Sequence, residues 1–387
     1  MKVLVFDRCF TVKGHRIPYV SLVAEAFADH DVIVALPAQL KDQPVLRDYF
    51  PSCVKFQFFK SEQKAKPLAG IRESWRCLTE QIKVCRPDMV AVPTADGMAF
   101  WGGIRNLIGL PATGGIPINI SLMRGHFRSP SDSWVNRTVS NFKWWVVTKG
   151  PWRKTLLIDP RSFHDLKNPA KCNVVLCPDP APPQAFDSRL DCRKALAFPE
   201  KGRMIVSVGN QEFRKGTDVL LQAFERATLA PDDFLVLMGK FDSQTRHLAE
   251  QILQNGSKKD RLIVRDSFVS DDELQQAVVA SNLVAVPYRD VERPSGIVSR
   301  SVAWNRPVIG TDRGWIKWFI DQYEAGYTTD PDEIPKFSQD LRLALTESEH
   351  FRPSSLAEKF QAFNSEQSYR SVWRALTKTE DRKTWLQ

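Results

Sequence analysis

The stretch that decides the fold is Val206-Ser207-Val208-Gly209-Asn210-Gln211-Glu212-Phe213-Arg214-Lys215-Gly216. An apolar run ends at Gly209, and a polar loop follows it. A helical pattern begins near Gly216 and keeps its apolar residues on one face through residues 215–227. A short apolar strand that leads through a loop into an amphipathic helix is the repeating unit of parallel sheets that helices cover on both faces.

The same alternation continues along most of the chain. It is regular after this stretch and less regular before it. We therefore predict an α/β protein with two Rossmann-like parallel-sheet domains. The predicted strands are 3–7, 31–36, 54–59, 89–93, 116–122, 155–159, 173–176, 204–208, 234–239, 262–265, 283–287 and 307–311, and the predicted helices include 15–29, 69–85, 98–108, 215–227 and 271–281.

The chain is 387 residues long, which is too long for one compact core and suits two domains. The proline-rich segment 177–183 has the composition of a linker. We place the domains at 1–180 and 181–350, with a wholly helical segment at 351–387.

Charge is unevenly distributed. Residues 1–180 hold 25 Lys and Arg against 15 Asp and Glu, and residues 181–387 hold 29 against 30. The basic half is compatible with an anionic partner such as a lipid surface, a phosphorylated acceptor or nucleic acid, and equally with a solvated face that has no partner. Because no nucleic-acid motif accompanies the charge, nucleic acid is the least favoured of the three.

The sequence favours the cytoplasm. No apolar run reaches the length of a spanning helix, and the residues after Met1 lack the apolar centre of a signal peptide. The seven cysteines include no CxxC pair and are expected to be reduced. Residues 134–154 mix tryptophans with Lys and Arg, which is typical either of a peripheral segment on the inner membrane face or of core tryptophans.

Two loops carry the predicted binding chemistry. Arg214 and Lys215 place cations after the strand that ends at Gly209, although any surface loop can carry such charges. In the second loop, Ser295-Gly296 opens a helix whose first N–H groups are free to bind an anion. Glu292 precedes it and can accept hydrogen bonds from sugar hydroxyls, or form a salt bridge to a neighbouring arginine.

Together these segments resemble the family 4 glycosyltransferases with the GT-B fold. The resemblance rests on the strand, loop and Lys215-Gly216, then on the loop with Glu292 and Gly296, and finally on residues 307–312 and 326–331. It is good over residues 200–340 and only architectural over 1–180. It implies two domains facing across a cleft, and retaining transfer of a sugar from a nucleoside diphosphate to a hydroxyl acceptor such as a glycan or a lipid-linked sugar.

The resemblance also implies residue roles. Lys215 would contact the donor diphosphate, Glu292 would touch the donor sugar, and the N–H groups of Ser295, Gly296 and Ile297 would bind the distal phosphate. The helices of 351–387 would cross back to the first domain. No cofactor and no metal are expected.

Two positions depart from the family pattern. Arg300 replaces the glutamate that would hold the nucleotide ribose, and arginine has no acceptor. Asn210 replaces an arginine that often follows the strand glycine, a loss for which Arg214 could compensate. Arg300 motivates the alternative function, a GT-B scaffold that has lost catalysis and serves as an interaction protein.

The first half supplies two further candidates. Gly14 lies in a loop that resembles the family's glycine-containing loop, or in a simple turn before a helix. His126 follows the strand 116–122, where relatives often place a histidine near the donor sugar, although a lone histidine is commonly structural. The predicted catalytic residues are Glu292 and His126, and the predicted substrate-binding residues are Gly14, Asn210, Arg214, Lys215, Ser295, Gly296, Ile297 and Arg300.

Overall fold

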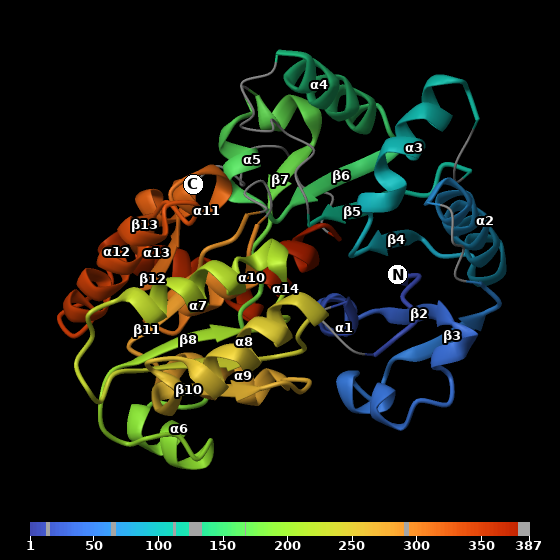
Figure 1. The fold of residues 1–387 in the computed structure, drawn as a ribbon. Coiled ribbons are helices and arrows are strands. Elements are labelled where there is room, and N and C mark those ends of the chain that lie inside the picture. Colours follow the sequence, from blue (N-terminus) through green and yellow to red (C-terminus); the bar gives the residue numbers. More distant parts are fainter. Residues whose placement is uncertain are drawn as a thin grey trace. The chain divides into compact units, whose positions relative to one another are not determined.

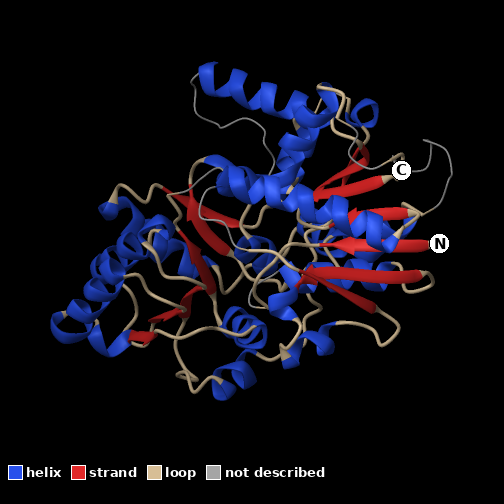
Figure 2. Cartoon of the chain, turned by 90° about the vertical axis from the view of Figure 1, so that its right-hand side faces the viewer, coloured by secondary structure: helices blue, strands red, loops and turns tan. Residues whose placement is uncertain are grey.

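The computed structural model describes residues 1–12, 16–62, 67–110, 114–123, 134–166, 168–289 and 294–377. The chain forms two compact units, each with its own parallel sheet (Figures 1 and 2). Unit 1 comprises Met1–Pro180 and Ser365–Gln387, and unit 2 comprises Ala181–Asn364.

The sheet of unit 1 has seven strands in the order β3-β2-β1-β4-β5-β6-β7, and all of its pairs are parallel. Successive side chains point to opposite faces, so Val3 and Val5 enter one core while Leu4 and Phe6 enter the other. The strands are β1 (Lys2–Phe6), β2 (Asp31–Pro37), β3 (Lys55–Phe59), β4 (Met89–Val92), β5 (Ile118–Leu122), β6 (Trp152–Leu157) and β7 (Val174–Leu176).

Helices cover both faces of this sheet. Residues from α1 and α14 share one core with Val3 and Val5, and residues from α2, α3 and α4 share the other with Leu4 and Phe6. The helices of unit 1 are α1 (Arg16–Ala26), α2 (Pro67–Cys85), α3 (Asp96–Leu107), α4 (Trp134–Thr148), α5 (Pro160–His164) and α14 (Glu366–Ala375).

The sheet of unit 2 has six parallel strands in the order β10-β9-β8-β11-β12-β13. Strands β8 and β11 are neighbours at its centre, so the loops that follow them start side by side. The strands are β8 (Met204–Val208), β9 (Phe234–Met238), β10 (Leu262–Arg265), β11 (Leu283–Val286), β12 (Val308–Thr311) and β13 (Gly326–Thr329).

The helices of unit 2 lie on both faces of its sheet. Residues of α7, α8 and α12 form one core, and residues of α6, α9, α10, α11 and α13 contribute to the other. The helices are α6 (Arg189–Ala195), α7 (Thr217–Arg226), α8 (Ser243–Asn255), α9 (Asp271–Ala280), α10 (Gly296–Ala303), α11 (Gly314–Tyr323), α12 (Ile334–Glu347) and α13 (Ser355–Phe363).

The fold class is confirmed, and each predicted strand is present with small shifts of its ends. The largest shift is at β6, which begins at Trp152 rather than at 155. Several elements were not predicted individually, namely β13, α4, α5, α6, α8 and α11. Strand β13 has a polar sequence, Gly-Tyr-Thr-Thr, and α4 lies in the segment that was read as interfacial or core tryptophans.

The terminal helices divide differently from the expected segment 351–387. Helix α13 belongs to unit 2, because Ala357 and Phe360 are buried in the unit 2 core. Only α14 belongs to unit 1, where Tyr369 and Trp373 are buried with residues of α1. The chain therefore passes between the units twice, after Pro180 and after Asn364.

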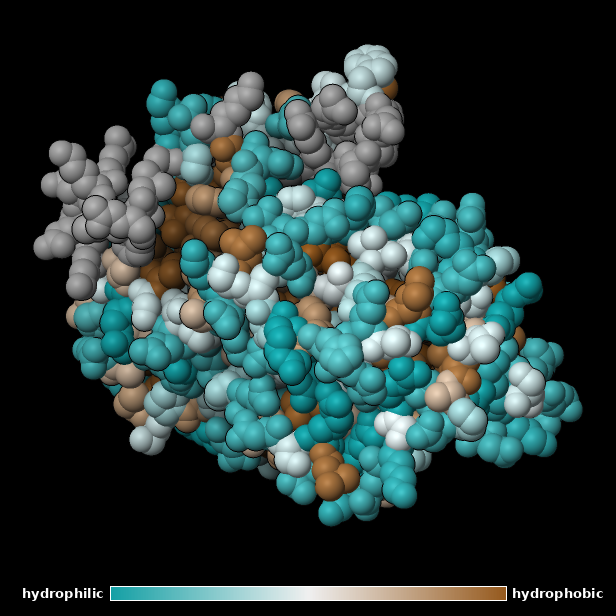
Figure 3. Space-filling model, turned by 90° about the vertical axis from the view of Figure 1, so that its left-hand side faces the viewer, coloured by the Kyte–Doolittle hydropathy of each residue, from teal (hydrophilic) through white to brown (hydrophobic). Residues whose placement is uncertain are grey.

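The surface is mostly hydrophilic on the face shown in Figure 3, with hydrophobic residues gathered in a few patches.

The tryptophans of the basic segment 134–154 were expected to lie either in the core or on a membrane-facing surface. Trp144 and Trp152 are buried, whereas Trp134 and Trp145 are exposed. In the described part of the chain, no helix combines the length and the apolar character needed to cross a bilayer. The cysteines whose side chains are described are all free.

Candidate functional site

Hydrogen bonds and an ion pair join the loops after β8 and β11 to each other at the carboxyl edge of the unit 2 sheet. The backbone N–H of Arg289 donates to the Arg214 carbonyl at 2.9 Å, and its guanidinium donates to the Phe213 carbonyl at 2.6 Å. The same guanidinium makes a bidentate pair with the buried Asp218 at 2.6 and 2.8 Å. Ligands of open parallel sheets bind at this edge.

Glycine makes the close approach of these loops feasible. Gly216 has φ +68°, and a Cβ there would lie 2.0 Å from the Pro287 carbonyl oxygen. Gly209 has φ +96°, and its Cβ would lie 3.1 Å from the Lys215 ammonium. The two loops can pack this tightly only because Gly216 carries no side chain, and the absence of a side chain at Gly209 leaves room for the Lys215 ammonium on the same loop.

We expect Gly216→Ala to lower the free energy of unfolding by about 2 kcal/mol or more, since it combines a left-handed backbone with a clash. Urea unfolding of the purified variant measures this change. Gly296→Ala is the matched control, because no described atom lies within 4 Å of a Cβ at Gly296. Equal stability of the two variants would contradict the packing role of Gly216.

Lys215 occupies the centre of the joined loops. Its Nζ lies 5.5 Å from the centroid of the Tyr288 ring, which comes from the neighbouring loop. The side chain is half-buried, and no carboxylate among the described residues pairs with it. A cation without a carboxylate, held at the carboxyl edge of a parallel sheet, is suited to bind a phosphate group.

Helix α10 starts in the second loop with an open first turn. Ser295 is buried and caps the helix, accepting from the Val298 N–H at 3.4 Å. The Gly296 position faces open space, and Ile297 packs against the core. Ser295 thus uses its hydroxyl for capping, while no described residue outside the helix accepts from the N–H groups of Gly296 and Ile297, which are suited to bind an anion.

Arg214 and Asn210 are tied to one another through Glu212. The Glu212 carboxylate accepts from the Asn210 amide at 3.0 Å and from the Arg214 guanidinium at 3.2 Å. Both predicted binding residues therefore lie on the loop with Lys215, but Glu212 partly neutralises the arginine.

Arg300 forms an ion pair with Asp271, at 3.2 Å. Asp271 is the first residue of α9, and its side chain is 66% exposed. The pair offers guanidinium donors together with a carboxylate acceptor. Sequence reasoning did not identify Asp271, because its partner is 29 positions away.

Gln211 is a second residue that sequence reasoning missed. Its amide is buried, donates to the carbonyls of Ser207, Gly209 and Met238, and accepts from the Thr217 hydroxyl. It ties the end of β8 to the end of β9. The signal available in the sequence was a glutamine directly after a buried strand, which is also common in exposed loops.

Three predicted site residues, Gly14, His126 and Glu292, lie outside the described residues. At the carboxyl end of β1, the buried carboxylate of Asp7 pairs with Arg16 at 2.5 Å and accepts from the Thr94 hydroxyl. Burial raises the pKa of the Asp7 carboxyl above its usual range. No group of three or more potential metal ligands occurs in the described ranges.

Comparison with known proteins matches residues 188–361 to the family described as glycosyl transferases group 1. A curated relative, the uncharacterized glycosyltransferase MJ1607 of Methanocaldococcus jannaschii, is 25% identical over 154 residues. That match spans 39% of this chain and 38% of the relative.

Solved structures share the fold over nearly the whole chain. Sucrose-phosphate synthase from Thermosynechococcus elongatus has a TM-score of 0.68 at 15% identity, with 97% of this chain and 99% of that chain covered. Anabaena Alr3699/HepE in complex with UDP has a TM-score of 0.65 at 14% identity, covering 97% and 98%. The glycosyltransferase WaaG gives 0.64 at 13%, covering 98% and 100%.

The architecture of both units is thus that of GT-B glycosyltransferases, and the family match covers the unit that contains the joined loops. Residues 188–361 of this chain thus resemble the glycosyl transferases group 1 family, whose model they match.

Proposed function

We propose that the protein transfers a sugar, in particular a hexose, from a nucleoside diphosphate donor to a hydroxyl acceptor such as a glycan or a lipid-linked sugar. The observation that carries the proposal is Lys215, a cation without a described carboxylate partner. It lies on the loop that is fastened to the loop opening α10. Anabaena HepE, which shares the fold, is described in complex with UDP and with UDP-glucose.

In the proposed reaction, the bond between the anomeric carbon and the diphosphate oxygen breaks, and the acceptor hydroxyl oxygen bonds to the anomeric carbon. Attack on the face that the diphosphate leaves retains the configuration, and the leaving phosphate takes the hydroxyl proton. Negative charge grows on the diphosphate, where Lys215 and the N–H groups at Gly296 and Ile297 stabilise it. These groups supply the positive potential in a metal-independent mechanism without a cofactor.

The Arg300–Asp271 pair is proposed to serve the nucleotide. Arg300 cannot accept a hydrogen bond, whereas the exposed Asp271 carboxylate beside it can accept from ribose hydroxyls. The proposed location is the cytoplasm.

Donor binding is tested by thermal unfolding with UDP-, GDP- and ADP-sugars. At about 100 times its dissociation constant, a ligand that binds only the folded protein adds about 2.7 kcal/mol and should raise the melting temperature by about 5 °C. Asp271→Asn should reduce the shift for the preferred nucleotide, and Asp272→Asn, at the next position of α9, is its control. A flat response to all three nucleotides would favour the non-catalytic scaffold.

A further inference from the structure

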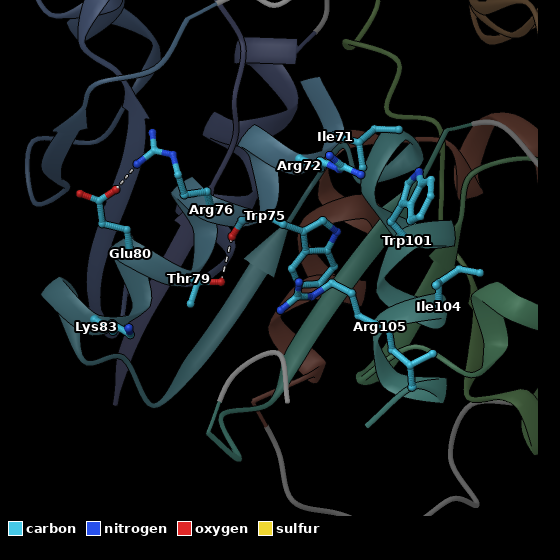
Figure 4. Close-up of a pocket in the computed structure, with 11 residues that line it drawn as sticks. Ile71, Arg72, Trp75, Arg76, Thr79, Glu80, Lys83, Trp101, Ile104 and Arg105 are labelled. Carbon is cyan, nitrogen blue, oxygen red and sulfur yellow. Dashed lines mark hydrogen bonds and ion pairs between the residues drawn. The ribbon is translucent and has the colours of Figure 1, made fainter. Parts of the chain in front are cut away.

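A groove of about 560 Å³ lies between α2 and α3 of unit 1 (Figure 4). Both helices cover the face of the unit 1 sheet that carries Leu4 and Phe6, so the groove is built from residues of unit 1, whereas the joined loops belong to unit 2. Its volume is in the range of sites for small amphipathic molecules. The groove is lined by Ile71, Arg72, Trp75, Arg76, Thr79, Glu80, Lys83, Trp101, Ile104, Arg105 and Ile108.

The floor of the groove is apolar. Trp75 is 4% exposed and donates its indole N–H to the Met98 carbonyl at 3.3 Å, so its one polar atom is already satisfied. Isoleucines and Trp101 complete the lining from both helices. Burying an apolar chain on such a surface is favourable, and the surface offers few hydrogen-bond partners to sugar hydroxyls.

Cations surround this floor. Arg76 is paired with Glu73 and Glu80. In contrast, Arg72, Lys83 and Arg105 have no carboxylate partner within the described ranges. The Arg105 guanidinium lies 5.6 Å from the Trp75 ring centroid, and its Nε is buried without a hydrogen-bond partner. The rim therefore has an excess of positive charge directly beside an apolar floor.

The neighbouring helix α4 also exposes apolar side chains. Helix α4 packs on α3, which in turn packs on α2. Its outer side exposes Trp134, Val139, Phe142 and Trp145, of which Trp134 is 74% exposed. Unit 1 therefore carries both exposed aromatic residues and unpaired cations, a combination that is typical of domains that contact the interface of an anionic bilayer.

We propose that the groove between α2 and α3 binds the apolar chain of an anionic lipid, with the lipid's phosphate held by Lys83 and Arg105. The proposal is independent of sugar transfer, because the groove lies on unit 1 and its binding is measured without a donor. A neutral lipid would leave the rim cations unpaired, and free phosphate would leave the apolar floor exposed to water. The cationic rim and the apolar floor, the two halves of the site, therefore select an anionic amphiphile together.

Calorimetric titration of the full chain with dodecyl phosphate, below its micelle concentration, tests the site. We expect saturable binding that weakens on the order of 100-fold for octyl phosphate, since four methylenes fewer are buried. Inorganic phosphate and neutral dodecyl maltoside should bind far more weakly. Sedimentation with phosphatidylcholine vesicles, with and without phosphatidylglycerol, should show binding only to the anionic vesicles.

Two variants separate the halves of the site. Lys83→Gln/Arg105→Gln should weaken dodecyl phosphate binding about 10-fold, and Lys194→Gln/Lys201→Gln, with two exposed lysines of unit 2, should not. Thr79→Trp should fill the groove and abolish the dependence on chain length while leaving the rim charges in place.

The proposal is overturned if dodecyl maltoside binds as tightly as dodecyl phosphate, or if Thr79→Trp binds both alkyl phosphates like the wild type. Circular dichroism melting checks the fold of each variant. Ile108→Asn, at a position that is 66% exposed, provides a groove variant with little risk to the core and should also weaken binding of the chain.

Discussion

Lys215→Ala is expected to lower the rate of sugar transfer at least about 100-fold, as loss of one preorganised charge-stabilising donor does in other enzymes. The side chain lies between Gly209 and the Tyr288 ring, and its ammonium pairs with no described carboxylate. The Lys215 ammonium can therefore stabilise the negative charge that develops on the leaving diphosphate. The measurement is kcat with the donor identified by thermal unfolding.

Lys201→Ala is the matched control, because this exposed lysine precedes the amino end of the same strand, β8. It should retain wild-type turnover. Lys215→Arg should recover part of the activity, since it restores the charge with a different geometry. Wild-type turnover by Lys215→Ala would remove the main support for the proposed mechanism.

Arg193→Ala is expected to lower the free energy of unfolding by at least about 3 kcal/mol. Arg193 is 3% exposed and has no carboxylate partner in the described part of unit 2. Burial lowers the pKa of its guanidinium to about 10, so it remains charged at neutral pH. Its five N–H contacts reach the carbonyls of Ala280, Pro199, Glu200 and Gly202 and the side chain of Asn282.

Removing the guanidinium takes the side-chain donor from the buried Ala280 carbonyl and from three partly buried carbonyls, and it empties space in the core, which together cost more than a single exposed hydrogen bond. Urea unfolding measures the change. Arg246→Ala is the control, because Arg246 also donates to a backbone carbonyl, that of Phe241, but its side chain is 48% exposed and pairs with Asp266. This substitution should change stability by less than about 1 kcal/mol. Similar losses in both variants would mean that Arg193 is not a buried anchor of unit 2.

Unit 2 was the more predictable part because its strands are short, apolar and separated by helices of clear period. Strand β13 was not predicted because Gly326–Thr329 is polar. It is an edge strand, which pairs on one side only and so is less buried than a central apolar strand. The end of unit 2 was not predicted either. Helices α13 and α14 have similar amphipathic patterns, and only the burial of Phe360 and Tyr369 in different cores separates them.

The sequence predicted the two loops of the candidate site, because each loop follows an apolar strand. Lys215 lies on the loop after β8, and Gly296 opens the helix after the β11 loop. The neighbouring positions of β8 and β11 bring the two loops together. Contacts between distant positions could not be read from the sequence. Arg289 pairs with Asp218, 71 positions away, and the Gln211 amide reaches Met238 on another strand.

The position of α14 has a consequence for biosynthesis. Unit 1 buries Tyr369 and Trp373, which leave the ribosome after the whole of unit 2 has been made. A nascent chain of the first 180 residues would therefore expose the α1 surface that these two aromatic rings cover. Unit 2, which is continuous in sequence, can complete its core during translation, so the unit that is synthesised first is the one that matures last.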